Sequence, residues 1–313
     1  MNLRDRVLHS LTAAPVDGYR PAAFFLHFGS AYQRGQAAVD RHLEFFRTTG
    51  MDFVKIQYEL AFPHLPEIKQ PRDWAKMPLY TEDYYQPHLE IVEGLVRAAG
   101  REALVIQTLY SPFMCAGHTT SDAVITSHLL QDPESVRRGL EIITESLLIF
   151  VRACKRLGVD GFYASTQGAE AHRFADPSTF EHYIKPYDLT VLQETKACPL
   201  TILHICDYCG PYADLTPFID YPGQVINASL ALTTKTLTPR DISAMFERPF
   251  MGGMDRHGVI ARGDHYAIRN AVRSILADAP DGFVLGADCT VPGETPWDHL
   301  RTAIELAHQG DRP

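Results

Sequence analysis

The feature that most constrains this sequence is the alternation, along its whole length, of short β-rich runs with longer stretches of helical periodicity. Such alternation is typical of a parallel sheet whose strands are joined by crossover helices. Eight runs are expected to be strands, at residues 22–29, 52–58, 103–110, 161–166, 200–206, 224–230, 249–255 and 282–289. Eight strand–helix units without a linker predict an α/β fold with a single (β/α)8 TIM barrel. An open doubly wound sheet is the alternative, although the glycine-rich nucleotide-binding fingerprints are absent from the sequence.

The clearest predicted helix spans residues 133–157, where one apolar stripe recurs at helical spacing. Asp132 is its expected cap, and Gly158 is expected to end it. Further helices are expected to begin at three pairs of a capping residue and a proline, Asp176-Pro177, Thr238-Pro239 and Thr295-Pro296.

The whole chain, residues 1–313, is expected to form one domain with long loops at 59–83 and 111–131. These segments follow predicted strands, so they are expected to cover the barrel mouth, where barrel enzymes carry their chemistry. The net charge of −9 argues against nucleic acid or an anionic membrane as a partner. No apolar run approaches the roughly 18 residues of a membrane span, and the N-terminus lacks a secretory pattern, so we expect a cytoplasmic protein.

A candidate metal site follows from the fifth predicted strand, which reads LTILHIC. Side chains alternate along a strand, so His204 and Cys206 face the same side, towards the barrel interior. Cys289 ends the eighth predicted strand at a corresponding depth. One imidazole and two thiolates with a fourth position open is a recognised catalytic Zn²⁺ set. Such a centre would activate a substrate thiol for attack on carbon.

Three other interpretations of these residues stay open. Taken singly, a histidine or free cysteine on a strand is more often a packed core residue than a ligand. The CxxC pair Cys206 and Cys209 is also compatible with a redox motif. If Cys209 joined the other three ligands, the metal site would be closed and structural.

Other polar residues stand at predicted strand ends. Asp288, Asp255 and Tyr163 are candidate catalytic residues. Alternatively, Asp288 would support the neighbouring metal ligands, Asp255 would cap a turn or helix, and Tyr163 would be a packing residue. The candidate substrate-binding residues are Tyr58, Gln107, Tyr110, Gln167 and Asn227.

Several motifs, in this order, resemble the uroporphyrinogen decarboxylase (URO-D) family: GVDGF at 158–162, FEHYIKPY at 180–187, HICDYCG at 204–210, GGMD at 252–255 and VLGADCTVPGETPWDHLRTAIE from 284 onward. The resemblance covers essentially the whole chain and implies a TIM barrel. Decarboxylases of this family carry an arginine-rich segment of the type RQAGR and a catalytic aspartate after the second strand. This chain has FFLHFGSAYQRG and KIQYELAF at those places, so both signatures are missing.

The other branch of the family contains cobamide-dependent methyltransferases, which the chain resembles more closely. That resemblance implies Zn²⁺ held by His204, Cys206 and Cys289, and methyl transfer between a corrinoid protein or small methylated donor and a thiol or other sulfur acceptor. The implied partners are a small-molecule substrate, a corrinoid protein and a second copy in a homodimer. The alternatives are a decarboxylase of porphyrin metabolism and a non-catalytic corrinoid-binding or ligand-binding barrel.

Overall fold

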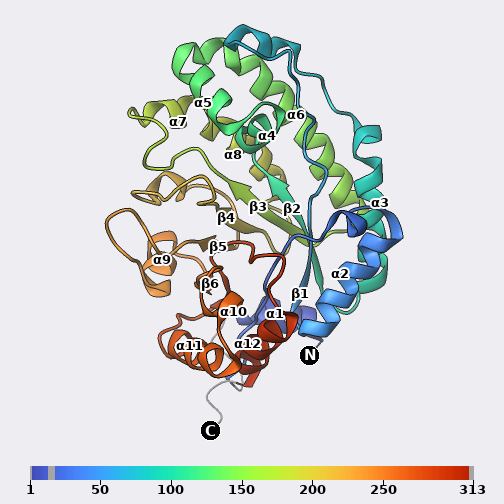
Figure 1. Ribbon diagram of the computed structural model, residues 1–313. Helices are drawn as coiled ribbons and strands as arrows, with labels where there is room; N and C mark the ends of the chain where they lie inside the picture. The colour runs from blue at the N-terminus through green and yellow to red at the C-terminus, as the bar shows by residue number, and fades with distance from the viewer. Residues whose placement is uncertain (1, 13–17, 310–313) are drawn as a thin grey trace.

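The centre of the molecule is a seven-stranded parallel sheet in the order β1-β2-β3-β4-β5-β6-β7 (Figure 1). The computed structural model describes residues 2–12 and 18–309. The strands are β1 (Phe53–Ile56), β2 (Leu104–Tyr110), β3 (Gly161–Thr166), β4 (Ile202–Ile205), β5 (Val225–Ala228), β6 (Phe250–Met254) and β7 (Val284–Ala287). Each lies inside one of the predicted ranges, so seven of the eight predicted strands are confirmed.

The first predicted strand, at residues 22–29, is not a regular strand, and the complete eight-stranded barrel is therefore not confirmed. Only Ala22 forms a β-bridge, a parallel one with Leu285 of β7. Pro21 has no N–H to donate, and the N–H of Ala22 donates to the Asp52 side chain instead of the backbone of a neighbouring strand. The segment still lies between the two edges of the sheet, because Asp52 N–H donates to Ala22 O and Ala23 N–H donates to Leu285 O, each at 3.0 Å.

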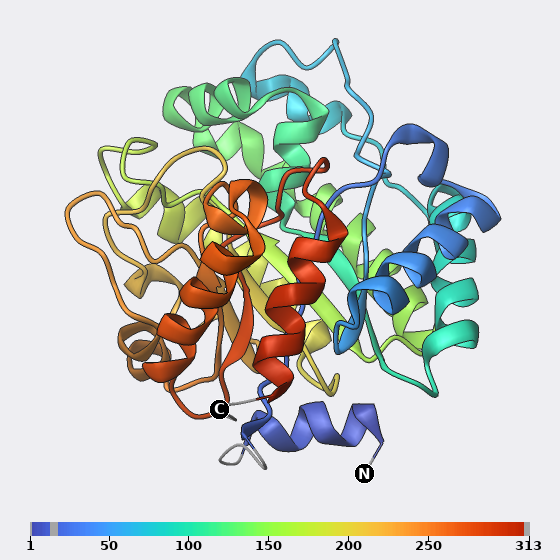
Figure 2. The ribbon, with the colours of Figure 1, turned by 60° about the horizontal axis from the view of Figure 1, so that its bottom comes forward.

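Helices lie around the sheet, most of them on its outer side, and the N-terminal helix lies below the strands in the view of Figure 2 (Figures 1 and 2). They are α1 (Leu3–Ser10), α2 (Gly35–Thr49), α3 (Glu82–Ala99), α4 (Pro112–Thr119), α5 (Asp122–Gln131), α6 (Pro133–Leu157), α7 (Ser178–Tyr183), α8 (Lys185–Thr195), α9 (Pro239–Phe246), α10 (Val259–Arg262), α11 (His265–Ala277) and α12 (Trp297–Gln309), with 3₁₀ turns η2 (Ser30–Tyr32), η3 (Pro71–Lys76) and η4 (Thr216–Phe218). Within residues 2–12 and 18–309, no helix is both long and apolar enough to cross a membrane.

Helix α6 has the bounds that the sequence predicts. The Asp132 carboxylate accepts the N–H of Ser135 at 3.2 Å, and Gly158 ends the helix in the left-handed conformation, with φ of 93°. The three predicted proline starts are confirmed to within a residue or two: α9 begins at Pro239, α7 one residue after Pro177, and α12 at Trp297.

Residues 111–131, expected to be a loop, instead fold into α4 and α5. The Ser111 and Ser121 hydroxyls accept the N–H groups of Met114 and Val124, so each serine caps one of these helices. Residues 59–83 are mainly irregular and contain η3. Because α4 directly follows β2, both helices lie at the carboxyl end of the sheet.

Candidate metal centre

A pocket of about 690 Å³ opens at the carboxyl ends of the strands. That volume is typical of sites for small ligands. Its walls come from several strands and from α4 and α5, and they include Lys55, Tyr110, Met114, His118, Asp122, Tyr163, Gln167, His204, Cys206, Arg256 and Cys289. The pocket therefore lies where the chemistry of a barrel is expected.

His204, Cys206 and Cys289 converge in this pocket. Their ligand atoms all lie within 4.8 Å of one another, and His204 Nε2 is 3.4 Å from Cys289 Sγ. His204 lies on β4, Cys206 follows that strand directly, and Cys289 lies two residues beyond β7. In the part of the chain that the structure describes, the cluster has these three members and leaves out Cys209. The arrangement thus offers one nitrogen and two sulfur donors, which suit Zn²⁺.

The hydrogen bonding of His204 fits a metal ligand better than a packed core histidine. His204 is 2% exposed, and its Nδ1 has no hydrogen-bond partner among the described residues. The buried His42 is different, because its Nδ1 donates to Ala38 O at 2.7 Å while its Nε2 accepts the N–H of Gln57. The other nitrogen of His204, Nε2, faces the Cys289 thiol in the pocket and not a backbone group, so it is the ring atom placed to bind a cation together with the two sulfur atoms.

The two thiols are electrostatically linked. The Cys206 thiol lowers the pKa of Cys289 well below its usual value, and the His204 ring and the Arg256 guanidinium add to this effect. The hydrogen bond with Cys289 in turn raises the pKa of Cys206. Thiolates, not thiols, bind metal ions. Because this pair already favours one thiolate, a divalent cation would need to displace a proton from only one of the two thiols.

Arg256 joins the two segments that carry the cysteines. Its Nη1 lies 2.8 Å from Asp207 Oδ1 and 3.0 Å from Asp288 Oδ2, and its backbone N–H donates to Asp288 Oδ1. Asp207 directly follows Cys206, and Asp288 directly precedes Cys289. We call Arg256, Asp207 and Asp288 the clasp, because they fasten the two cysteine-bearing segments to each other.

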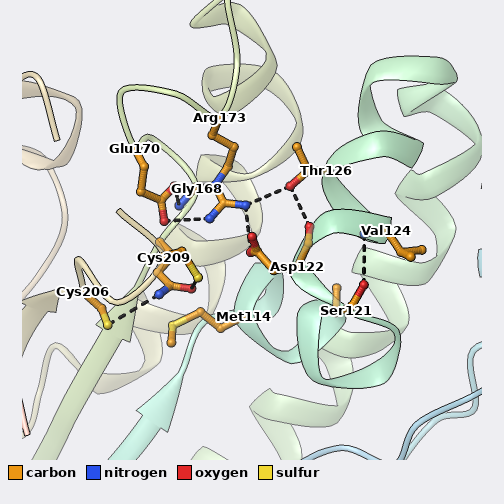
Figure 3. Close-up of polar contacts among 12 residues, drawn as sticks. Met114, Ser121, Asp122, Val124, Thr126, Gly168, Glu170, Arg173, Cys206 and Cys209 are labelled. Carbon is orange, nitrogen blue, oxygen red and sulfur yellow. Dashed lines mark hydrogen bonds and ion pairs between the residues drawn. The ribbon is translucent and has the colours of Figure 1, made fainter. Parts of the chain in front are cut away.

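Gln167 contacts two cysteines, and the loop that follows it carries a buried ion pair between Glu170 and Arg173 (Figure 3). The Gln167 amide donates to Cys206 Sγ at 3.5 Å, and its oxygen accepts from Cys209 Sγ at 3.8 Å. In the same loop, Arg173 pairs with Glu170 and reaches Asp122 of α5 at 2.8 Å. The Glu170 and Arg173 side chains are almost completely buried, so this pair fixes α5 against the pocket wall.

Three of the remaining predicted site residues border the pocket. Tyr110 and Gln167 line it, and so does Tyr163, whose ring stacks on the His204 ring with centroids 4.9 Å apart. The Tyr163 hydroxyl donates to Asn227 at 2.6 Å, which fixes the ring beside the imidazole.

The other predicted substrate-binding residues lie outside the pocket lining. Asn227 uses its amide to donate to the carbonyls of Met251 and Ala287, both at 2.9 Å, so it joins neighbouring strands. Gln107 accepts a hydrogen bond from His88, and Tyr58 packs edge-on against the same histidine ring. These contacts indicate packing roles.

The two aspartates predicted to be catalytic also have structural contacts. Asp255 is exposed and accepts the N–H of His257 at 2.8 Å, as a turn residue does. Asp288 belongs to the clasp, and neither residue is part of the pocket lining. Burial raises the pKa of Asp288, although Arg256 opposes this effect.

Sequence reasoning missed two cations in the pocket, Lys55 and Arg256. A signal for Lys55 was available, since a lysine within the apolar run DFVKIQY must be buried on one face of the strand. Arg256 follows Asp255 directly, but its two carboxylate partners are 49 and 32 positions away. No local pattern connects them.

The protein is thus an α/β protein with a barrel-like parallel sheet, and its cluster of one histidine and two cysteines lies at the end of the strands where barrel enzymes carry their active sites. The model of the uroporphyrinogen decarboxylase (URO-D) family matches residues 44–310. The chain belongs to this family, which confirms the resemblance seen in its motifs.

Two relatives bear the name methylcobamide:CoM methyltransferase MtbA. The protein from Methanosarcina mazei is 24% identical over 221 residues, 70% of this chain and 62% of its own. The one from Methanosarcina acetivorans is 24% identical over 244 residues, 77% of this chain and 69% of its own. The match with the M. mazei relative thus spans less than two thirds of that protein.

Solved structures support the fold. A methyltransferase from M. mazei superposes with a TM-score of 0.77 at 15% identity, over 98% of both chains. A putative vitamin-B12 independent methionine synthase from Listeria monocytogenes gives a TM-score of 0.56 at 15% identity, over 95% of this chain and 98% of that one.

Proposed function

We propose that this protein is a zinc-dependent methyltransferase, moving a methyl group from a corrinoid protein or a small methylated donor to a thiol or other sulfur acceptor. The convergence of His204, Cys206 and Cys289 within 4.8 Å is the observation that carries the proposal. The names of the two Methanosarcina relatives support it.

The donor set suits this chemistry. Zn²⁺ in a site of one imidazole and two thiolates supplies a Lewis acid that lowers the pKa of a substrate thiol. In the transfer, the new S–C bond forms as the bond from carbon to the donor breaks, the electron pair leaves with the donor, and the thiol proton passes to solvent. The chain's own part is to hold the three ligands on rigid strand ends and to enclose the acceptor, with Tyr163 fixing the His204 ring.

The pocket is poorly suited to porphyrinogen decarboxylation. A macrocycle with eight carboxylates needs several guanidinium partners. Among the described residues, Arg256 is the one arginine in the pocket lining, and two carboxylates already hold it. We therefore expect no turnover of uroporphyrinogen.

Metal analysis tests the donor set. We expect about one zinc per purified wild-type chain and strongly reduced zinc in Cys206→Ser and Cys289→Ser, because each change removes a thiolate. Cys209→Ser is the matched control, since Cys209 lies nearby but outside the cluster. Undiminished zinc in both ligand variants would overturn the proposal, and zinc lost from Cys209→Ser would indicate a closed structural site.

A transfer assay tests the reaction. Methylcobalamin, as a free donor, is incubated with the zinc-loaded protein and a small thiol, and the methyl thioether is measured. We expect product with the wild type and with Cys209→Ser, and none above background with Cys289→Ser. Tight corrinoid binding without methylation of any thiol would instead support a non-catalytic binding barrel.

A further inference from the structure

Cys206 and Cys289 bring two sulfur atoms close together from distant parts of the chain. Cys206 follows β4 and Cys289 lies beyond β7, yet their Sγ atoms are within 4.8 Å of each other. In a disulfide, two sulfur atoms are about 2.05 Å apart. The separation of the two sulfur atoms would therefore have to shrink by less than about 3 Å for a bond to form.

The clasp holds these two cysteines together without a metal ion. Arg256 contacts Asp207 at 2.8 Å and Asp288 at 3.0 Å, and these aspartates adjoin Cys206 and Cys289 in the sequence. None of the three clasp residues belongs to the donor cluster. The two sulfur atoms therefore stay close to each other when the cluster holds no metal.

A small oxidant can reach this pair through the pocket. Both cysteines line the cavity of about 690 Å³; Cys206 is 5% exposed, and Cys289 is half-buried. Cys115 and Cys154, in contrast, are completely buried and lie outside the pocket lining. Access thus favours oxidation at the cluster over oxidation in the core.

Cys209 is the competing partner of Cys206, because the two form the CxxC pair seen in the sequence. The Gln167 amide bridges these two thiols: its nitrogen donates to Cys206 Sγ at 3.5 Å, and its oxygen accepts from Cys209 Sγ at 3.8 Å (Figure 3). A disulfide within the CxxC pair would have to expel this amide. Cys206 and Cys289 are instead hydrogen-bonded directly to each other.

We propose that Cys206 and Cys289 form a reversible redox switch: in the metal-free protein a hydroperoxide oxidises them to a disulfide, and this disulfide excludes the metal ion. The inference shares its ligand residues with the proposed function, but the oxidation needs neither a methyl donor nor an acceptor. A sulfur atom in a disulfide is no longer a thiolate, so the cluster loses two of its three donors.

The oxidation is balanced with hydrogen peroxide as the oxidant. The more exposed sulfur, that of Cys289, takes one oxygen atom as the O–O bond breaks, which gives a sulfenic acid and one water molecule. The Cys206 sulfur then attacks the Cys289 sulfur, the S–S bond forms, and the hydroxyl group leaves with the Cys206 proton as a second water molecule. A small dithiol reverses the reaction by thiol–disulfide exchange.

Peroxide treatment of the metal-free wild type tests the switch. Free thiols are counted in denaturant, and linked peptides are identified by mass spectrometry. We expect the protein to lose two of its six free thiols, to yield a peptide that links Cys206 to Cys289, and to lose its capacity to bind zinc. Dithiothreitol should restore both the thiols and the zinc binding. Zinc-loaded protein should keep all six thiols under the same conditions.

Two variants assign the reaction to this pair. Cys209→Ser should form the same disulfide as the wild type, because Cys209 takes no part in it. Cys289→Ser should form no disulfide, because Gln167 separates Cys206 from its remaining neighbour Cys209. The peptide map of the wild type decides the matter even if a variant does not fold.

The outcomes separate this inference from the proposed function. A wild-type disulfide between Cys206 and Cys209, the persistence of all six thiols, or zinc binding by the oxidised protein would overturn the switch alone. A loss of thiols that dithiothreitol does not reverse would overturn it too. Absence of zinc from the reduced wild type would overturn the proposed function, whereas a linked Cys206–Cys289 peptide would still establish the redox pair.

Discussion

The clasp makes a quantitative prediction about metal affinity. In Arg256→Met the guanidinium is lost, and the carboxylates of Asp207 and Asp288 are left facing each other without a cation. These residues adjoin Cys206 and Cys289, so repulsion between the carboxylates would push the two sulfur ligands apart. We expect weaker zinc binding, although no ligand has been changed.

The structure sets the size of the effect. The side chains of Arg256, Asp207 and Asp288 are 14%, 15% and 15% exposed. Breaking a fully buried ion pair by removing one partner costs about 3–5 kcal/mol, and the residual exposure here lowers that to roughly 1–3 kcal/mol. Loss of groups that orient metal ligands typically weakens metal affinity by about 10- to 100-fold, which is the range we expect.

Competition with a chromophoric zinc chelator measures this affinity, with circular dichroism and urea unfolding as checks on folding. Arg256→Lys keeps the charge but not the planar fork, so its affinity should lie between those of the wild type and Arg256→Met. Arg240→Met is the matched control, because its ion pair with Asp278 is more than half exposed. Wild-type zinc affinity in a correctly folded Arg256→Met protein would refute the clasp.

Two further predictions concern the scaffold. In Gly161→Ala, the added Cβ would meet the carbonyl oxygen of Leu200 at 1.7 Å, so β3 or the residues that lead into β4 must shift. Urea unfolding should show a loss of about 3 kcal/mol. Gly29→Ala should change stability little, because no described atom beyond the chain neighbours lies within 4 Å of its added Cβ. Burial lowers the pKa of His42 from 6.5 to about 4, so its stabilising contribution is complete above pH 6.5 and is lost as the pH falls towards 4. The wild type should lose about 2 kcal/mol more than His42→Gln between roughly pH 7.5 and pH 5, and equal losses in urea unfolding would contradict this.

Much of the fold could be predicted from the sequence because the signals are local. The bounds of β3 and α6 follow from runs of β-branched and aromatic residues or from an apolar stripe with a cap and a glycine at its ends. The strand predicted at residues 22–29 is not formed, and the reason lies in contacts with residues far away in the sequence. It has the composition of a strand, but its backbone bonds to Asp52 and Leu285 involve residues 21–23, and further along Leu26 O and Phe28 O accept from the Gln57 and Gln33 side chains.

The convergence of the three donor residues could be predicted for a similar reason, since strand alternation places His204 and Cys206 on one side and Cys289 lies two residues past the end of another strand. The roles of the other polar residues were not predictable, because their partners lie far away in the sequence. The position of Asn227 at a strand end predicts a pocket residue, whereas in the structure its amide donates to the carbonyls of Met251 and Ala287. The same holds for Asp288, whose partner Arg256 belongs to another strand-end segment.

Two observations together distinguish ligand-binding residues from packing residues. The first is an incomplete set of hydrogen-bond partners, and the second is a position in the pocket wall. Neither is sufficient alone. The Tyr58 hydroxyl is buried without a partner in the described chain, but Tyr58 is not part of the pocket lining. Gln167 lines the pocket, but its amide already contacts two sulfur atoms.

His204 meets both conditions, because its Nδ1 has no partner among the described residues and its Nε2 faces Cys289 Sγ in the pocket wall. A divalent cation held by one imidazole and two thiolates would carry no net charge, so an acceptor thiolate bound there would make the centre negative by one unit.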